Sequence, residues 1–554
     1  MLVWKRRVQT HETISSKYQV NIVGVQVVSK AADMAKVSAR GSFHVLWGLV
    51  VSTLISSIGT IFIARLLGSD LYGLYGIALT APTLIGVFRD WGINSAMVRS
   101  TAQCRAENEP SAIRKVFLSG LIFEIVMGLV LSAVAFALSG FFATNIFHRP
   151  EIVALIQIGS ISVLASGIIN AATAAFTGTE RMELNSVMLI CQSVVKILVM
   201  ITLVLFGLGT AGAVTGYVSG LAFGAVVGVA LIWVIYRKLP KPVGPVDGIK
   251  TWTKEMLTYG APISIGNIIG SFQAQFYATL LPYFYVNNNS IIGNYSLANT
   301  FVVLISFFAV PVTTMMFPAF SKLNAKKDAE TIQNVFQFSV KYASLLVVPV
   351  AALIMSLSEP AVSTLFGNAY SSTALFLTLL SISYLYTALG SLSTVNLIIS
   401  QGQTGFSLVL TVITAAIGVP MGYVLINQFG VLGLVVTGLT SGLPSTFLSL
   451  YFAKKNYGVS VNWSSSARIL LSAGIAGVLT FEFISYLSWA SLLKLVIGVV
   501  FFTIIFVFSA LLTRSVVRSD INNLRQMSGG FGFITKVVTK VLNIIEKIMS
   551  VLHL

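Results

Sequence analysis

Charged residues are scarce in this chain. Only 10% of its 554 residues are Asp, Glu, Lys or Arg, whereas 56% are hydrophobic, and the mean hydropathy is +0.87. A soluble globule of this size needs far more polar groups to cover its surface. The composition therefore excludes a soluble protein and predicts an all-α polytopic membrane protein.

Cysteine and histidine are also scarce. Cys104 and Cys191 are the two cysteines, and the four histidines lack the spacing of metal ligands, so neither a disulfide framework nor a metal site is indicated. A catalytic triad, a phosphate-binding glycine loop and paired metal carboxylates are also missing. We therefore expect no enzyme, no cofactor and no metal. The first residues lack the apolar core of a signal peptide, so we expect none to be cleaved.

Long apolar runs are what the sequence has in abundance. A helix of roughly 20 apolar residues crosses about 30 Å of hydrocarbon. Polar breaks separate fourteen such runs. Their approximate limits are 42–66, 73–98, 115–141, 152–176, 184–206, 210–236, 257–284, 291–317, 333–357, 371–399, 405–427, 430–453, 468–487 and 490–513.

Lys and Arg are distributed unevenly between the two sides of the membrane. If the N-terminus is inside, 29 of these residues lie inside, two lie outside (Arg65 and Arg149) and four lie within spans. Cytoplasmic loops are enriched in Lys and Arg, so both termini are expected in the cytoplasm and the protein in the cytoplasmic membrane. Topology thus accounts for the net charge of +17, and nucleic acid is not an expected partner.

The spans divide the chain into six segments. These are a cytoplasmic amphipathic N-terminal segment (1–41), a first six-helix bundle (42–236), a cytoplasmic basic linker (237–256), a second six-helix bundle (257–453), two further helices (468–513) and a cytoplasmic amphipathic tail (514–554). In the tail, Lys536, Lys540 and Lys547 lie off an apolar stripe with helical spacing. This pattern predicts a helix on the inner leaflet, with a partner-binding helix as the alternative.

Two short stretches of the chain share Gly, Tyr, Ala and Thr at the same places. "GLYGIALT" at 73–80 matches "GNYSLANT" at 293–300, and three further matches, "SAIRKVF" with "ETIQNVF", "SIS" with "SIS", and "GTAG" with "GVLG", lie 219 to 221 residues apart. Collinear matches at one offset indicate an internal duplication. Each copy holds six helices, an even number. We therefore expect parallel repeats related by an axis along the membrane normal, with a substrate site between them.

Four stretches resemble a known family. They are "IARLLGSDLYGLYGIALT" (63–80), "FRDWGINSAMVR" (88–99), "FPAFSKL" (317–323) and "LFGNAY" (365–370). In their order and spacing, residues 40–455 are similar to the polysaccharide-synthesis and lipid-linked oligosaccharide flippases of the multidrug/oligosaccharidyl-lipid/polysaccharide exporter superfamily. The resemblance implies a V-shaped molecule of two six-helix bundles that opens alternately to each side of the membrane. It also implies a lipid-linked glycan substrate, membrane lipids, a glycan polymerase or glycosyltransferases as partners, and a monomeric transport unit.

Charged groups within the spans are functional candidates because their burial in a membrane is costly. Lys196, near the middle of its span, is expected to contact an anionic phosphate or sugar acid, with an ion pair to Glu124 or Asp90 as the alternative. Lys341 is a second substrate contact unless it snorkels to the inside. Asp90 pairs either with Arg89 or with a basic residue of another helix, or the two residues serve ligand binding and ion coupling. Glu124 is a second ion-coupling candidate.

The span 257–284 carries a polar stripe of Asn267, Gln273 and Gln275. These side chains either hydrogen-bond sugar hydroxyls or hold helices together. Arg65 and Lys494, near outer helix ends, are explained by snorkelling.

Three functions fit these features. The leading one is a transporter that flips a polyprenyl-phosphate-linked oligosaccharide or polysaccharide repeat unit by alternating access. A cation-coupled multidrug antiporter of the same superfamily is the alternative, but its cavity should be net acidic, whereas the buried candidates tilt basic by one charge. A membrane scaffold for glycan-synthesis enzymes would explain the tails but not the buried polar groups.

Overall fold

The computed structural model describes residues 48–240, 248–323 and 328–518, together with 520, 521, 525, 539, 540, 543 and 546. Throughout this part, the regular elements are α-helices with short 3-10 and π segments. The expected N-terminal segment (1–41), residues 241–247 of the basic linker and most of the amphipathic tail lie outside the described residues.

Eleven helices in the described part are long and apolar enough to cross a membrane. The chain is therefore an all-helical, multi-pass membrane protein, as predicted. Two of the eleven, Gly48–Gly86 and Met182–Lys238, contain a glycine with positive φ, +71° at Gly68 and +85° at Gly207. Glycine adopts such angles without a steric penalty, so the chain can bend there. Gly48–Gly86 covers parts of two expected spans and Met182–Lys238 covers two in full, and the total of fourteen stays a prediction.

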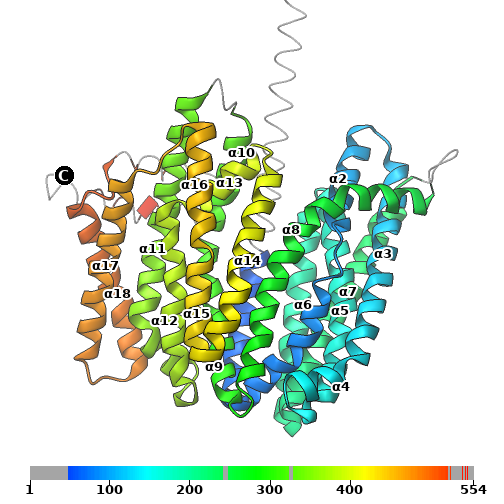
Figure 1. Ribbon diagram of the computed structural model, residues 1–554, viewed down its shortest axis with the longest axis horizontal. Helices are drawn as coiled ribbons and strands as arrows, with labels where there is room; N and C mark the ends of the chain where they lie inside the picture. Colours follow the sequence, from blue (N-terminus) through cyan, green and yellow to red (C-terminus); the bar gives the residue numbers. More distant parts are fainter. Residues whose placement is uncertain are drawn as a thin grey trace, which may run out of the picture.

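The first group of helices lies on the right in Figure 1. It comprises α2 (Ile93–Ala106), α3 (Pro110–Ala137), α4 (Ser139–Phe141), α5 (Val153–Gly178), α6 (Met182–Leu203) and α7 (Gly209–Lys238). Helix α5 is central, because it packs against α2, α3 and α7, and α7 packs against α6. Buried alanines and glycines on α5 let the neighbouring backbones approach closely.

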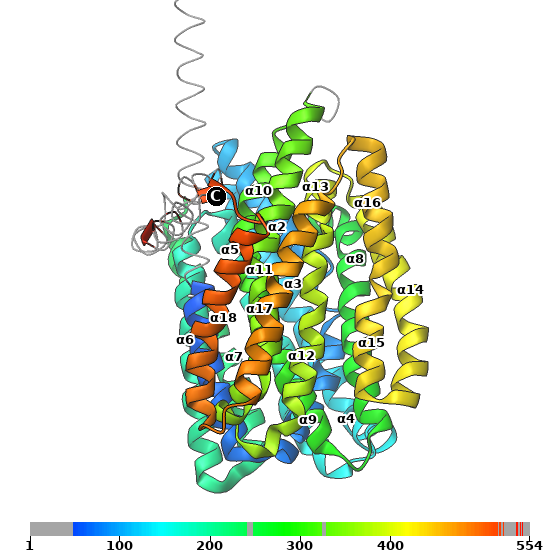
Figure 2. The same ribbon diagram turned by 90° about the vertical axis from the view of Figure 1, so that its left-hand side faces the viewer.

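The second group lies on the left in Figure 1. It comprises α9 (Asn289–Val302), α10 (Val310–Ser321), α11 (Ala329–Leu365), α12 (Ser371–Leu385), α13 (Ser391–Ser400), α14 (Thr404–Phe429), α15 (Val431–Ser441) and α16 (Leu443–Tyr457). Two later helices, α17 (Trp463–Ser485) and α18 (Ser491–Leu512), pack against α11 on the outer side of this group (Figure 2).

Helix α8 (Ile249–Phe284) connects the two groups. It packs against α2 and α3 of the first group and against α14 of the second. Its polar stripe is therefore placed between helices that belong to different halves of the chain.

The buried apolar residues form cores with different extents. One core combines residues of the first helix (Gly48–Gly86) with residues of both groups, and its members include Ala64, Ile77, Leu297 and Tyr370. This core lies toward the end of the molecule where α4 and α9 are found (Figure 1). We call this end the distal face. Toward the opposite, proximal face, 93–256 and 320–461 contribute to two separate cores. The halves are thus joined at the distal face.

Several helices are interrupted inside the molecule. Between Gly86 and α2 the chain leaves the helix, and α9 continues into α10 through a 3-10 segment, Val303–Phe308. Irregular backbone at membrane depth is tolerated only where it is buried in protein or lines a polar cavity. The first interruption contains the charged residues Arg89 and Asp90 and is therefore the candidate for a functional site.

Candidate functional site

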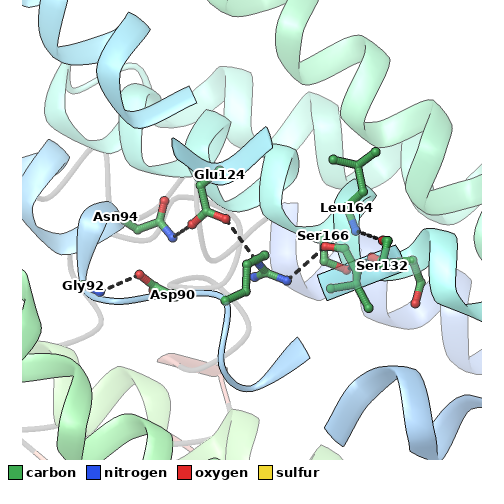
Figure 3. A network of polar contacts seen from close by, with 10 residues as sticks. Asp90, Gly92, Asn94, Glu124, Ser132, Leu164 and Ser166 are labelled. Carbon is green, nitrogen blue, oxygen red and sulfur yellow. Dashed lines mark hydrogen bonds and ion pairs between the residues drawn. The ribbon is translucent and has the colours of Figure 1, made fainter. Parts of the chain in front are cut away.

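The interruption before α2 brings a buried arginine against a buried carboxylate. Arg89 Nε donates to Glu124 Oε2 of α3 across 3.0 Å, and both side chains are nearly inaccessible to solvent. Asn94 Nδ2 donates to the second oxygen, Oε1, at 2.6 Å, as Figure 3 shows. Arg89 Nη1 reaches the carbonyl of Val163 on α5 at 3.3 Å. Such a paired and hydrogen-bonded arrangement is what a buried charge requires.

Helix α5 leaves room for this ion pair at Gly167. A Cβ atom there would lie 2.8 Å from Glu124 Oε2 and 2.9 Å from Arg89 Cδ. Both distances are too short for ordinary van der Waals contact, so any larger residue would push the pair apart. The glycine therefore helps to set the geometry of the site.

Asp90 differs from its neighbour in having no ion-pair partner among the described residues. Its Oδ1 accepts a hydrogen bond from the backbone N–H of Gly92 at 2.8 Å, and this contact stabilises the turn in which Gly92 has φ +80° (Figure 3). Because Arg89 is neutralised by Glu124, Asp90 leaves this region with one net negative charge.

A cavity of about 340 Å³ lies beside Arg89 and Asp90, between the first group and α8. Thr83 Oγ1, on the cavity wall, donates to Gln275 Oε1 at 3.0 Å and so links the first helix to α8. The other lining residues are Pro82, Gly86, Val87, Ser162, Val163, Ser166, Tyr217, Asn267, Ile268 and Ser271. Hydroxyl, amide and charged groups thus surround a space at the boundary between the two halves.

A smaller cavity of about 250 Å³ lies on the other side of Asp90, and its walls include Asn94, Asn170, Thr173 and Thr177. Asp90 lines both cavities. Its carboxylate is therefore the charged group shared by two polar spaces, one toward α8 and one within the first group.

Of the eight predicted site residues, the structure gathers five. Arg89, Asp90, Asn267 and Gln275 line the larger cavity, and Glu124 lies behind it, bound to Arg89. Gln273 is not among the lining residues of that cavity. Its Nε2 donates to Tyr277 Oη at 2.7 Å and to the carbonyl of Thr414 on α14 at 3.4 Å, so it holds helices together.

The two lysines lie elsewhere. Lys196 Nζ donates to Ser56 Oγ of the first helix at 3.1 Å, and the expected alternative pairing with Glu124 is replaced by the pairing of Glu124 with Arg89. Lys341 forms an ion pair of 2.6 Å with Asp520, which follows α18. Neither of these ammonium groups lines the 340 Å³ cavity.

These positions change the expected charge of the cavity. With Lys196 and Lys341 included, the net charge of the five buried candidates was expected to be +1. Without the two lysines, the charge of Arg89 is balanced by Glu124, and Asp90 gives the cavity a net charge of −1. The sequence could not give this sign, because it depends on which charged groups share a space.

Several lining residues were missed from the sequence alone. Asn94 stands four residues after Asp90, a spacing that could have placed both on one helical face. Tyr217, Ser162 and Ser166 gave no such signal, since single hydroxyl groups are frequent in membrane helices. Asp520, the partner of Lys341, was missed because it lies in the tail.

A larger cavity, about 760 Å³, lies between α11, α12 and α17. Its walls are mostly apolar, with Glu359 and Glu482 among the lining residues. It lies within the second half and its two added helices, so it is not placed between the halves as a shared transport path would be.

Known proteins resemble this chain in sequence. A family model described as polysaccharide biosynthesis protein matches residues 62–375. A probable low-salt glycan biosynthesis flippase of Haloferax volcanii, Agl15, is 22% identical over 276 residues, which are 49% of this chain and 57% of that protein. An uncharacterized membrane protein of Methanocaldococcus jannaschii is 21% identical over 449 residues, covering 78% of this chain and 87% of its own length. The match therefore spans little more than half of the Haloferax protein.

Solved structures share the fold. The lipid II flippase MurJ, in an inward closed conformation, superimposes with a TM-score of 0.65 at 14% identity, covering 85% of this chain and 99% of that one. An inward-facing multidrug resistance MATE family transporter of the MOP superfamily gives 0.61 at 16% identity, with coverages of 74% and 94%. The fold is thus MurJ-like and MATE-like. Since the family model covers more than half of the 554 residues, the chain belongs to the polysaccharide biosynthesis protein family.

Proposed function

We propose that the protein moves a polyprenyl-phosphate-linked oligosaccharide or polysaccharide repeat unit across the cytoplasmic membrane by alternating access. The observation that carries the proposal is the polar cavity between the interrupted helix of the first half and α8. Membership of a polysaccharide biosynthesis family and similarity to a probable glycan biosynthesis flippase point to a glycan as its cargo. Membrane lipids surround the protein, and a glycan polymerase or glycosyltransferases are proposed as further partners.

Within this proposal, both termini are cytoplasmic and fourteen spans form two parallel six-helix repeats plus two added helices. The proximal face is then cytoplasmic and the distal face extracellular. The 29-to-2 distribution of Lys and Arg supports this orientation. Shared apolar packing at the distal face, with separate cores at the proximal face, supports a state closed to the outside.

The cavity residues take different roles in the proposal. Arg89, Asn267 and Gln275 contact the glycan or its phosphate, because they offer guanidinium and amide N–H donors from both halves. Asp90, with Glu124 behind it, couples transport to a cation, since an unpaired carboxylate in a membrane cavity favours a proton or metal cation as its counter-ion. Lys196, Lys341 and Gln273 are bound to other helices and are left out of the pathway.

A cation-coupled antiporter is the second candidate. The observation that favours it is the single net negative charge of the cavity, which is the sign an organic cation needs. The MATE-like fold is compatible with this alternative.

Reconstitution of the protein into lipid vesicles distinguishes the glycan flippase from the antiporter. Vesicles containing the protein are loaded with a fluorescent polyprenyl-phosphate-linked oligosaccharide, and an impermeant quencher reports the fraction exposed outside. The proposal expects faster exposure than in empty vesicles and no faster uptake of ethidium. Ethidium transport without glycan exposure would establish the antiporter. In cells, deletion should lower surface glycan and leave lipid-linked glycan on the cytoplasmic leaflet, whereas altered drug sensitivity alone would contradict the proposal.

A further inference from the structure

Arg149, one of the two arginines assigned to the outside, is buried at the distal face. Its guanidinium donates to Asn289 Oδ1 at 2.7 Å and to the carbonyls of Pro282 at 3.1 Å and Tyr285 at 2.6 Å. A fourth bond, at 2.7 Å, goes to the carbonyl of Phe147 within its own loop. A loop of the first half is therefore fastened to the junction of α8 and α9 in the second half.

Tyr370 makes the matching contact in the opposite direction. Its hydroxyl donates to the carbonyl of Ala64 in the first helix at 2.8 Å. Tyr370 lies 221 residues after Arg149, and Tyr285, one of the acceptors of Arg149, lies 221 residues after Ala64. In one contact the donor belongs to the first half and the acceptor to the second, and in the other contact the halves are reversed. Both the two donors and the two acceptors are 221 residues apart, which is the pattern that a two-fold axis between two related units produces.

Two further contacts lie on the same axis. Ser69 Oγ is 2.6 Å from Ser290 Oγ, again with a separation of 221 residues. A Cβ atom on Gly73 would clash with the carbonyl oxygen of Asn289, and one on Gly293 would clash with that of Ser69. Because both Gly293 and Asn289 follow their counterparts, Gly73 and Ser69, by 220 residues, these close approaches are also reciprocal.

We propose that Arg149, Tyr370, Ser69 and Ser290, with the backbone approach at Gly73 and Gly293, form a clasp that holds the distal face shut. The clasp rests on the proposed function in one respect: alternating access requires it to open. Its bonds join the two halves at the end where they share a core. The first helix continues from Gly73 to Gly86, and the last residues of this helix line the cavity beside Asp90. The clasp is therefore the structural element that must break before the cavity can reach the outside.

Arg65 adds a one-sided contact to the same face. Its Nε donates to the carbonyl of Leu365 at 2.7 Å, and its Nη2 donates to that of Thr364. These carbonyls belong to the last turn of α11, where a cation is favoured by the unpaired acceptors and the helix dipole. Arg65 thus contacts the second half instead of simply snorkelling to the surface, as the sequence had led us to expect.

The sharpest test removes a single hydroxyl. In the full-length protein in lipid, spin labels on the distal ends of α4 and α12 report the distance between the halves. Tyr370→Phe should raise the population with a long distal distance by about two- to twelvefold, because a net hydrogen bond contributes roughly 0.5–1.5 kcal/mol. Tyr486→Phe is the matched control, since Tyr486 is 84% exposed beyond α17. An unchanged distribution in Tyr370→Phe would overturn the clasp.

Arg149→Ala should shift the same population further, because it removes three bonds between the halves. Lys494→Ala on α18 is its control, since this lysine lies outside the duplicated part. If Arg149→Ala fails to fold, the Tyr370→Phe result and a cysteine pair still decide the question.

The cysteine pair is Ser69→Cys with Ser290→Cys, in a background with Cys104 and Cys191 replaced by alanine. Oxidation should join the two positions, keep the distal distance short and stop glycan exposure, and reduction should restore it. A cross-linked protein whose distal distance still lengthens would overturn the clasp. If the distances respond as expected but no glycan moves in any variant, the clasp stands and the proposed function fails.

Discussion

The guanidinium of Arg89 and the carboxylate of Glu124 meet across 3.0 Å in a buried pocket, and Asn94 holds the remaining carboxylate oxygen. The pair neutralises an arginine that would otherwise be isolated at membrane depth. This relationship leaves Asp90 as the charged group of the cavity without an ion pair in the described part of the chain. The ion pair therefore stabilises the site, and Asp90 is the carboxylate that we propose for coupling to a cation.

Glu124→Ala should strongly destabilise the protein, because removing one partner of a buried pair costs about 3–5 kcal/mol. Thermal unfolding in detergent measures the loss. Replacing both partners, with Arg89→Met and Glu124→Leu together, should recover part of it. The control is Glu180→Ala, which breaks the exposed pair with Arg105 at 3.1 Å and should cost no more than about 1 kcal/mol. Equal losses from both alanine variants would contradict the burial argument.

Asp90→Asn should leave the fold intact and abolish the dependence of transport on a cation gradient. The asparagine oxygen can still accept the hydrogen bond from Gly92, so the turn is retained, but the charge is lost. Glycan exposure is measured in vesicles with imposed proton or sodium gradients. A variant that responds to the gradient as the unmodified protein does would remove Asp90 from the coupling role.

Lys341→Met should weaken the attachment of the segment after α18 without changing glycan binding. Lys341 pairs with Asp520 at 2.6 Å, and Tyr342 Oη donates to the other oxygen of that carboxylate at 3.2 Å. We expect faster proteolysis after α18 in Lys341→Met and in Asp520→Asn, with little further effect in the double variant. Weaker binding of the fluorescent oligosaccharide in Lys341→Met alone would return this lysine to the substrate site.

Gly73→Ala and Gly293→Ala should each hinder closure of the distal face, because the added methyl group meets backbone that cannot move independently. The reciprocal geometry predicts similar effects, seen as a longer distal distance between spin labels. Gly140→Ala is the control, since a Cβ there has nothing within 4 Å. A large effect in one glycine variant and none in the other would argue against a two-fold relation between the halves.

Part of the site could be predicted from the sequence because of the physics of membranes. Charge in an apolar run is costly, and that argument nominated five of the eight predicted residues, of which Arg89, Asp90 and Glu124 lie at the cavity. Lys196 and Lys341 met the same criterion, but their partners, Ser56 and Asp520, lie 140 and 179 residues away. Sequence distance of that size carries no information about contact.

Arg65 and Arg149 also show what the sequence could predict and what it could not. Counting Lys and Arg placed both outside, but the count could not distinguish a snorkelling side chain from one that joins two halves. The difference depends on which carbonyls lie within hydrogen-bonding distance of each guanidinium, and that follows from the packing of helix ends.

The sequence by itself determined the class of the protein, because composition and run length decide whether a chain is stable in water or in lipid. It also determined which residues carry unusual charge. Tertiary structure decided which of these charges cancel, which side chains share a cavity and which glycines meet across the halves. Those outcomes depend on the relative placement of distant helices, and local patterns in an apolar sequence contain too few distinctive letters to specify it.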